Sequence, residues 1–111
     1  MAYDEELASR IRALLGNEAD LTEKKMFGGL AFLVGGNMAI AASGQGGVLV
    51  RVDPAESDEL VDTTQATVAV MRDRPMQGWL RVDTEHVRSD AELAQWVDIG
   101  AGYARSLPRK R

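Results

Sequence analysis

The residues of this sequence best suited to chemistry are basic side chains in or beside segments with strand character. Lysine and arginine bind carboxylates and phosphates, and the planar guanidinium of arginine can do so through two parallel hydrogen bonds. We therefore predict a binding site for a small anionic ligand or an acidic partner surface. Its candidate residues are Lys25, Arg51, Arg72, Arg74 and Trp79, with Lys24 beside them. Ion pairing with nearby aspartates is the alternative use of these cations.

Catalytic and metal chemistry have little support in the sequence. His86 is the only histidine, and the acids near it, Asp83, Glu85 and Asp90, come without a second histidine or any cysteine. Such a set has no spacing that converges on a metal, and one histidine leaves few ways to activate a serine nucleophile. We predict no metal, no cofactor and no catalytic residue, and hence a protein that is not an enzyme.

Glycine is abundant in two places that could suggest a phosphate-binding loop. These are Gly28–Gly29 and the run over residues 44–47. A phosphate loop leads into a helix whose N-terminal amides hold the anion, and neither cluster precedes a helical pattern. We interpret both clusters as turn glycines.

Length and composition are those of one soluble domain over residues 1–111. Hydrophobic residues make up 45% and charged residues 27%, there is no cysteine, and the net charge is −4. The acidic N-terminus and the short apolar runs argue against a secretory signal or a membrane span, so we expect a cytoplasmic protein. The negative charge should repel a phosphate backbone, so direct nucleic-acid binding is disfavoured and we expect a solvated basic tail at 105–111. Contact of this tail with DNA is the alternative, and its affinity should fall steeply with salt.

Hydrophobic spacing predicts an α+β domain with the order α-β-β-β-α-β-β-α and a mostly antiparallel sheet. Helices are expected over 4–15, 53–61 and 89–107, with an Asp53 cap and a Ser89–Glu92 capping box. A three-strand meander is expected within 30–52, and two more strands over 67–71 and 79–82. Pro75 predicts that 72–78 is a connection. Residues 23–27 are a candidate extra strand, with Gly28–Gly29 as a turn or a bulge.

Strand alternation separates two faces of the expected sheet. The face predicted to meet the helices carries Leu30, Phe32, Val34, Met38, Ile40, Val48, Val50 and Val52. The opposite face carries Ala31, Leu33, Ala39, Ala41, Leu49 and Arg51, and it is more apolar than a solvated face usually is. Either another helix of the chain or a partner subunit should cover it. The candidate interface residues of a homodimer are Leu33, Leu49, Trp96, Ile99 and Tyr103.

Three runs of the sequence resemble the N-terminal domain of the TfoX/Sxy family. They are EKKMFGGLAF over residues 23–32, LVRVD over 49–53 and RPMQGW over 74–79. The late helix with Leu93 and Trp96 also fits, so the resemblance covers nearly the whole chain in the expected order. Competence regulators of this family carry a second, C-terminal domain, and we expect a stand-alone N-terminal domain here.

The resemblance implies an α+β fold similar to secretion chaperones. It also implies membership of a bacterial family named for regulators of natural competence. Those regulators are thought to act with the cyclic-AMP receptor protein at promoters. The leading hypothesis is therefore a non-enzymatic protein-interaction module that forms a homodimer or binds a protein partner, such as a transcription regulator. A domain that binds a small ligand or an anion is the alternative.

Overall fold

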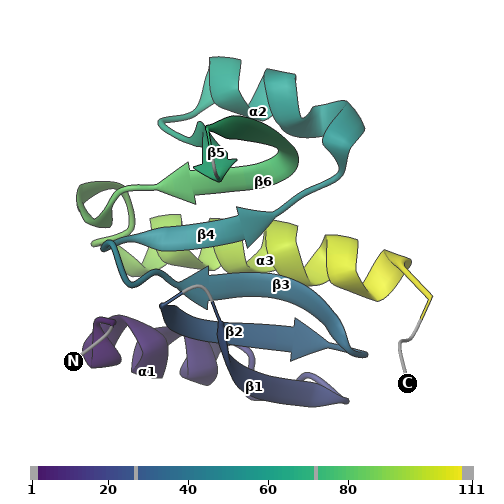
Figure 1. Cartoon of the computed structure of the whole chain (residues 1–111). Helices are drawn as coiled ribbons and strands as arrows, with labels where there is room; N and C mark the ends of the chain where they lie inside the picture. Colours follow the sequence, from purple (N-terminus) through teal and green to yellow (C-terminus); the bar gives the residue numbers. More distant parts are fainter. Residues whose placement is uncertain (1–2, 27, 72, 109–111) are drawn as a thin grey trace.

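One antiparallel sheet organises the computed structural model, which describes residues 3–26, 28–71 and 73–108 (Figure 1). The helices are α1 (Glu5–Leu14), α2 (Ser57–Thr63) and α3 (Asp90–Ser106). The strands are β1 (Leu21–Met26), β2 (Gly29–Val34), β3 (Asn37–Ala42), β4 (Val48–Arg51), β5 (Thr67–Met71) and β6 (Arg74–Val82). Short 3₁₀ turns occur at η1 (Pro54–Glu56) and η2 (Thr84–His86). The strand order is β1-β2-β3-β4-β6-β5, so β1 and β5 are the edges.

The predicted α+β class is confirmed, and the candidate extra strand is present as β1. Met26 at the end of β1 pairs with Gly29 at the start of β2, so the two strands form a tight hairpin. Gly28 lies in its connection with φ at +74°, a conformation that glycine adopts without a steric penalty. Gly28–Gly29 therefore belongs to a turn and not to a bulge within one long strand.

The sixth strand is longer than the sequence predicts, because residues 74–78 belong to β6 and not to a connection. Pro75 lies within this strand and pairs with Val70 of β5. On the other side, β4 ends at Arg51, opposite Trp79, and the last backbone bond, from the Val52 N–H, reaches Gly78 at 2.8 Å, so no described strand pairs with Pro75 there. A proline is tolerated at such a position because its missing N–H removes no bond to a further strand.

The helix predicted over 53–61 begins with a different geometry and ends later. Asp53 caps it as expected, since its carboxylate accepts a hydrogen bond from the backbone N–H of Ala55 at 2.9 Å. The first turn is the 3₁₀ turn η1, and the α-helical part α2 runs from Ser57 to Thr63. Asp53–Pro54 therefore marks the start correctly, while the tight first turn is not visible in the spacing.

The helices α1 and α3 lie behind the sheet in Figure 1 and cover one of its faces, while α2 packs on β6 and β5. The main core lies between these layers. Its fully buried large side chains come mainly from the strands and from the helices α1 and α3. They include Ile11, Phe32, Ile40, Val48, Val50, Val52, Leu80, Val82, Leu93 and Val97.

A bulge changes the predicted faces of β3. The register of β2 and β3 shifts between Phe32 and Leu33, so that Phe32 pairs with Ile40 but Leu33 pairs with Met38. Ala39 is the extra residue, and it lies in the main core beside Ile40. The alternation predicted Met38 on the face that meets the helices, but Met38 lies on the opposite face of the sheet. It predicted Ala39 on that opposite face, but Ala39 lies on the face that meets the helices. Strict alternation fails here because a bulge inserts one unpaired residue.

The long helix α3 starts at its predicted cap and crosses the sheet in close contact. The Ser89 hydroxyl accepts a hydrogen bond from the backbone N–H of Glu92 at 3.1 Å, which confirms the cap, and the Glu92 carboxylate accepts from that hydroxyl at 3.0 Å. Further along, a β-carbon on Gly100 would lie 2.3 Å from the carbonyl oxygen of Ala39. Only a residue without a side chain allows the helix backbone to approach the bulge this closely.

This contact generates a test with a matched pair of helix glycines. Gly100→Ala should lower the free energy of unfolding by about 1–3 kcal/mol, because the new methyl group meets backbone that cannot move aside. Gly102→Ala should instead raise it by up to about 1 kcal/mol, since a β-carbon there has no neighbour within 4 Å and alanine favours a helix. Urea denaturation of both variants measures the difference. Equal effects of the two substitutions would show that α3 does not pack on β3 as described.

Candidate functional site

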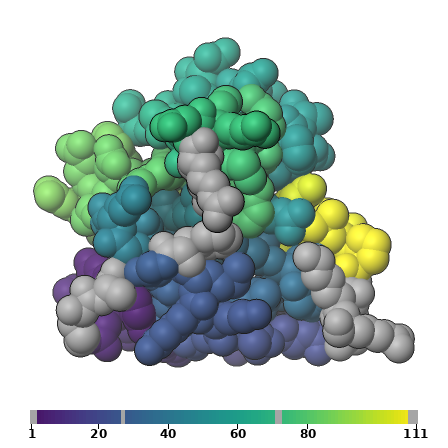
Figure 2. Space-filling model, viewed as in Figure 1, coloured from purple at the N-terminus to yellow at the C-terminus, as the bar shows by residue number. Residues whose placement is uncertain are grey.

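The sheet face turned away from α1 and α3 carries side chains from every strand of the sheet, and we call it the second face. Strand register places the following residues on it: Thr22, Lys24, Met26, Ala31, Leu33, Met38, Ala41, Leu49, Arg51, Thr67, Ala69, Arg74, Met76, Trp79 and Arg81. Figure 2 shows the molecule from the side of this face. Among the described residues, no helix covers it.

The floor of the second face is apolar and is covered by the chain's own side chains. Five buried residues form a cluster there: Ala31, Met38, Ala41, Leu49 and Ala69. Met26, Leu33 and Trp79 pack against this cluster and stay partly exposed. Since Met26 belongs to one edge strand and Ala69 to the other, the sheet curls so that both edges contribute. The second face is therefore a shallow apolar surface with a partly exposed rim.

The charges on the second face all have one sign. Register places Lys24, Arg51, Arg74 and Arg81 there and no aspartate or glutamate of the described residues. Arg81 is held in place by the loop between β3 and β4, because its guanidinium donates hydrogen bonds to the Gln45 side chain and to the backbone carbonyl of Gly46. Arg81 is not among the binding residues predicted from the sequence, although its alternation with Trp79 along the strand indicates it.

Arg51 lies beside two aromatic rings. Its guanidinium carbon is 5.3 Å from the ring centre of Trp79, the residue paired with it on β6, and 5.6 Å from that of Tyr103 on α3. Cation–π contacts at these distances hold the planar group in place without using its N–H donors. Within the described part of the chain, no carboxylate forms an ion pair with Arg51. Its donors can therefore bind an external carboxylate or phosphate.

The other predicted binding residues do not join this pair. Lys25 lies opposite Leu30, whose side chain belongs to the main core, so it is on the helix side of an edge strand. Register places Arg74 on the second face, but it is exposed at the start of β6 and not among the contacts of Arg51. Arg72 lies outside the described residues. The structure thus brings Arg51 and Trp79 together and adds Tyr103, which the sequence had suggested only as an interface residue.

The predicted interface residues fall into two groups. Leu49 and Trp96 are 6% and 4% exposed, so the chain itself already covers them and they offer little area to a partner. Leu33, Ile99 and Tyr103 keep part of their surface accessible. A homodimer through the second group stays a prediction.

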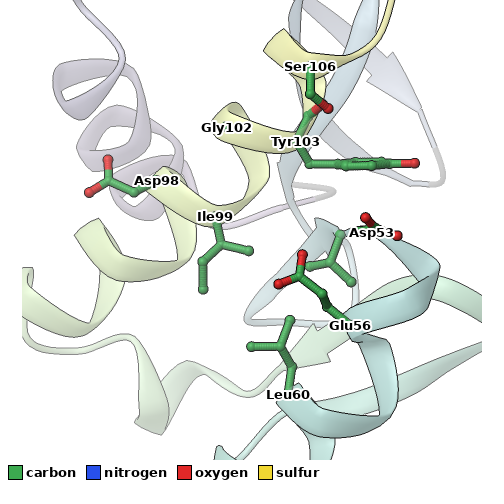
Figure 3. A pocket seen from close by; sticks show the side chains of 9 residues that line it. Asp53, Glu56, Leu60, Asp98, Ile99, Gly102, Tyr103 and Ser106 are labelled. Atoms are coloured by element: carbon green, nitrogen blue, oxygen red, sulfur yellow. The ribbon is translucent and has the colours of Figure 1, made fainter.

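A separate cleft of about 450 Å³ lies between α3 and the segment formed by η1 and α2 (Figure 3). Three acidic residues line it, Asp53, Glu56 and Asp98, and the side chain of Asp98 points away from the other two. Its apolar wall includes Ile99, and Tyr103 lies at the same cleft. Tyr103 therefore stands between an acidic cleft and the cationic Arg51. Sequence spacing gave no sign of this cleft, because its walls come from segments far apart in the chain.

An ion pair between Arg12 on α1 and Glu23 on β1 holds this carboxylate on the helix side of the sheet, away from the second face. The guanidinium of Arg12 donates two hydrogen bonds, at 2.6 and 2.7 Å, to the carboxylate of Glu23. The hydrogen bond from Arg12 lowers the pKa of Glu23 from its ordinary value, and the charge of Arg12 lowers it further. Glu23 is thus held ionised on the helix side of β1, between two residues of the second face, Thr22 and Lys24.

Metal sites and membrane spans find no support in the described residues. They contain no cluster of three or more histidine, cysteine or acidic side chains arranged to hold a metal ion. His86 ends the short turn η2, where its ring nitrogen lies 3.7 Å from a carboxylate oxygen of Glu85. None of the described helices combines the length and the apolar character that crossing a membrane requires.

Comparison with known proteins gives one match. The sequence model of the TfoX N-terminal domain family matches residues 13–103 of this chain. Neither a curated protein nor a solved structure matches it. The matched segment contains all six strands, Arg51, Trp79 and Tyr103.

The Arg12–Glu23 pair predicts a pH dependence of stability. The folded-state pKa of Glu23 is lowered, so its contribution is fully present above the unfolded value of about 4.5 and is lost as the pH falls through the lower folded value. Stability measured by urea denaturation should fall less steeply below pH 4.5 in Glu23→Gln than in the parent. Above that pH, Glu23→Gln should be the less stable protein. Parallel profiles for the two proteins would mean that the pair contributes nothing in solution.

Proposed function

The chain belongs to the TfoX N-terminal domain family, and from this premise we propose that it is a non-enzymatic binding module that docks an acidic segment of a partner protein on its second face. The observation that carries the proposal is Arg51. Two aromatic rings hold its guanidinium, and the described residues give it no carboxylate partner.

Charge complementarity supports an acidic partner. The chain has a net charge of −4, yet the charged side chains that register places on the second face are Lys24, Arg51, Arg74 and Arg81. Aligned charges on one face set the local field more strongly than the net charge of the molecule does. An acidic segment therefore meets attraction at this face and repulsion over much of the remaining surface.

The apolar rim supports a peptide over a simple ion. Met26, Leu33 and Trp79 are partly exposed around the buried floor. A segment that alternates acidic and apolar side chains could cover this rim with its apolar side chains and place a carboxylate at Arg51. Tryptophan and arginine are also the residues that most often dominate binding energy at protein interfaces.

Binding can be tested with a hexaglutamate peptide, because Trp79 reports on the site while the other tryptophan, Trp96, is buried in the main core. We expect a saturable change in tryptophan fluorescence that weakens as salt is added. Arg51→Ala should weaken binding at least about tenfold, equivalent to about 1.4 kcal/mol.

The controls separate the site from general charge effects. Arg88→Ala removes an equal charge at an exposed position outside the second face, and it should leave the affinity unchanged. A hexalysine peptide should not bind. If Arg51→Ala and Arg88→Ala bind hexaglutamate equally, the second face is not the docking surface.

A small-anion site is the second candidate function, and the free donors of Arg51 favour it. Inorganic phosphate or sulfate should then raise the thermal midpoint of the parent and not that of Arg51→Ala, because a ligand that binds only the folded state stabilises it. If neither anion shifts the midpoint while hexaglutamate still binds, the site requires a peptide.

We also propose that the acidic partner is a transcription regulator, and membership of the TfoX N-terminal domain family supports this. The tagged parent and the Arg51→Ala variant should be used side by side to capture proteins from nuclease-treated bacterial cytosol. Recovery of a transcription factor or a polymerase subunit by the parent alone would support regulation through a protein partner. Recovery of the same proteins by both would show that the second face does not select them.

A further inference from the structure

The outer side of β5 is an exposed sheet edge that the proposed function does not use. The inner side of β5 pairs with β6 from Thr67 opposite Arg81 to Met71 opposite Arg74. The register shifts between Val68 and Ala69, and the extra residues, 77–79, lie in β6, so β5 itself stays a continuous strand. In the ranges that the structure describes, no segment pairs with its outer side. The unpaired backbone N–H and C=O groups of an edge strand are a template for another strand.

The two edges of this sheet differ in how they are protected. The middle of β1 carries Glu23, Lys24 and Lys25, and charged side chains on an edge strand discourage pairing with other chains. In contrast, β5 has the sequence TVAVM, with no charge, no proline and no glycine. Valine and threonine also favour the extended conformation. Of the two edges, β5 is the one built for strand addition.

An exposed valine marks the same edge. Val70 is 63% exposed, and the only other large apolar side chain among the described residues with such exposure is Leu14, at 43% on α1. The neighbour on the same side of β5, Val68, is partly buried against the main core. The apolar surface of the core therefore continues through Val68 to the open edge at Val70.

We propose that β5 pairs antiparallel with β5 of a second copy of this chain. A two-fold axis between Ala69 and Ala69 of the partner subunit places Val70 of each subunit opposite Val68 of the other. These β-branched pairs bury the exposed valine, and cross-strand pairs of this kind stabilise a sheet. No charged side chain lies in β5, so the pairing brings no like charges together. The edge is thus complementary to itself, which is what a closed dimer requires.

The pairing also has a geometric consequence for binding. An axis that relates antiparallel strands of one continuous sheet is perpendicular to that sheet, so both second faces lie on the same side. Each contributes one Arg51 site. A partner with two acidic segments could then bind both subunits at once, with an avidity above that of a single site.

The test is the mass of the full chain in solution as a function of its concentration. In sedimentation equilibrium the parent should move from 12.1 kDa toward twice that mass as concentration rises. V70K should stay monomeric over the same range. L14K places the same charge on the other exposed apolar residue and should behave like the parent. Both positions are exposed, so both variants should fold, which circular dichroism and urea denaturation verify.

A second measurement locates the contact. Backbone amides of β5 should exchange more slowly with deuterium at high than at low protein concentration in the parent and in L14K, but not in V70K. A parent that stays monomeric at every concentration, or a V70K protein that dimerises as the parent does, would overturn the proposal. Growth of the parent beyond a dimer would overturn it as well, because pairing of unlike edges makes open chains.

Discussion

The contact between Gly100 of α3 and the bulge at Ala39 of β3 is the constraint on which most of this structure depends. The helix backbone there lies so close that a β-carbon would be 2.3 Å from the carbonyl oxygen of Ala39. This approach sets the position of α3 over the sheet, and with it the burial of Trp96 in the main core. Tyr103, nearly one turn beyond Gly100, is thereby brought to within reach of Arg51. The close contact between Gly100 and Ala39 thus places Tyr103, one of the two aromatic rings beside Arg51, at the candidate site.

Charge is distributed unevenly over the two sides of the sheet. Asp53, Glu56 and Asp98 all line the cleft between α3 and the α2 segment, while the second face carries only cations among its charged, described residues. Glu23 is the acid nearest to the second face along β1, and Arg12 holds it on the helix side. A molecule that is negative overall can therefore attract an acid locally, because fields near a surface depend on the nearest charges.

Much of this fold follows from short-range signals in the sequence. Periodicity and caps predicted the three helices closely, and alternation predicted five of the strands and indicated the sixth at residues 23–27. The failures occur where one element depends on another. Pro75 lies in a strand because β4 stops short of it, and Met38 and Ala39 exchange faces because β2 and β3 shift register. Neither fact is encoded in the residues around it.

The candidate site shows the same division. Arg51 and Trp79 were singled out from their types, and the structure pairs them. Arg81 was missed although strand alternation pointed to it, and the approach of Tyr103 required the position of α3 over the sheet. Lys25 was included because of its sequence neighbourhood, yet its register with Leu30 puts it on the helix side. Residue type thus indicated the chemistry, and tertiary packing selected which residues share a surface.

The strand order has a consequence for the way in which the site forms during folding. Each strand from β1 to β4 pairs with the next one along the chain, and β5 pairs with β6 in the same way. The strands β4 and β6 also pair, but they are not consecutive in the chain. Local hairpins close quickly, and the longer loop between β4 and β6 costs more entropy to close. Arg51 and Trp79 face each other across that late junction. Neither hairpin unit alone contains the pair, so an intermediate with both units folded but unjoined would have no binding site.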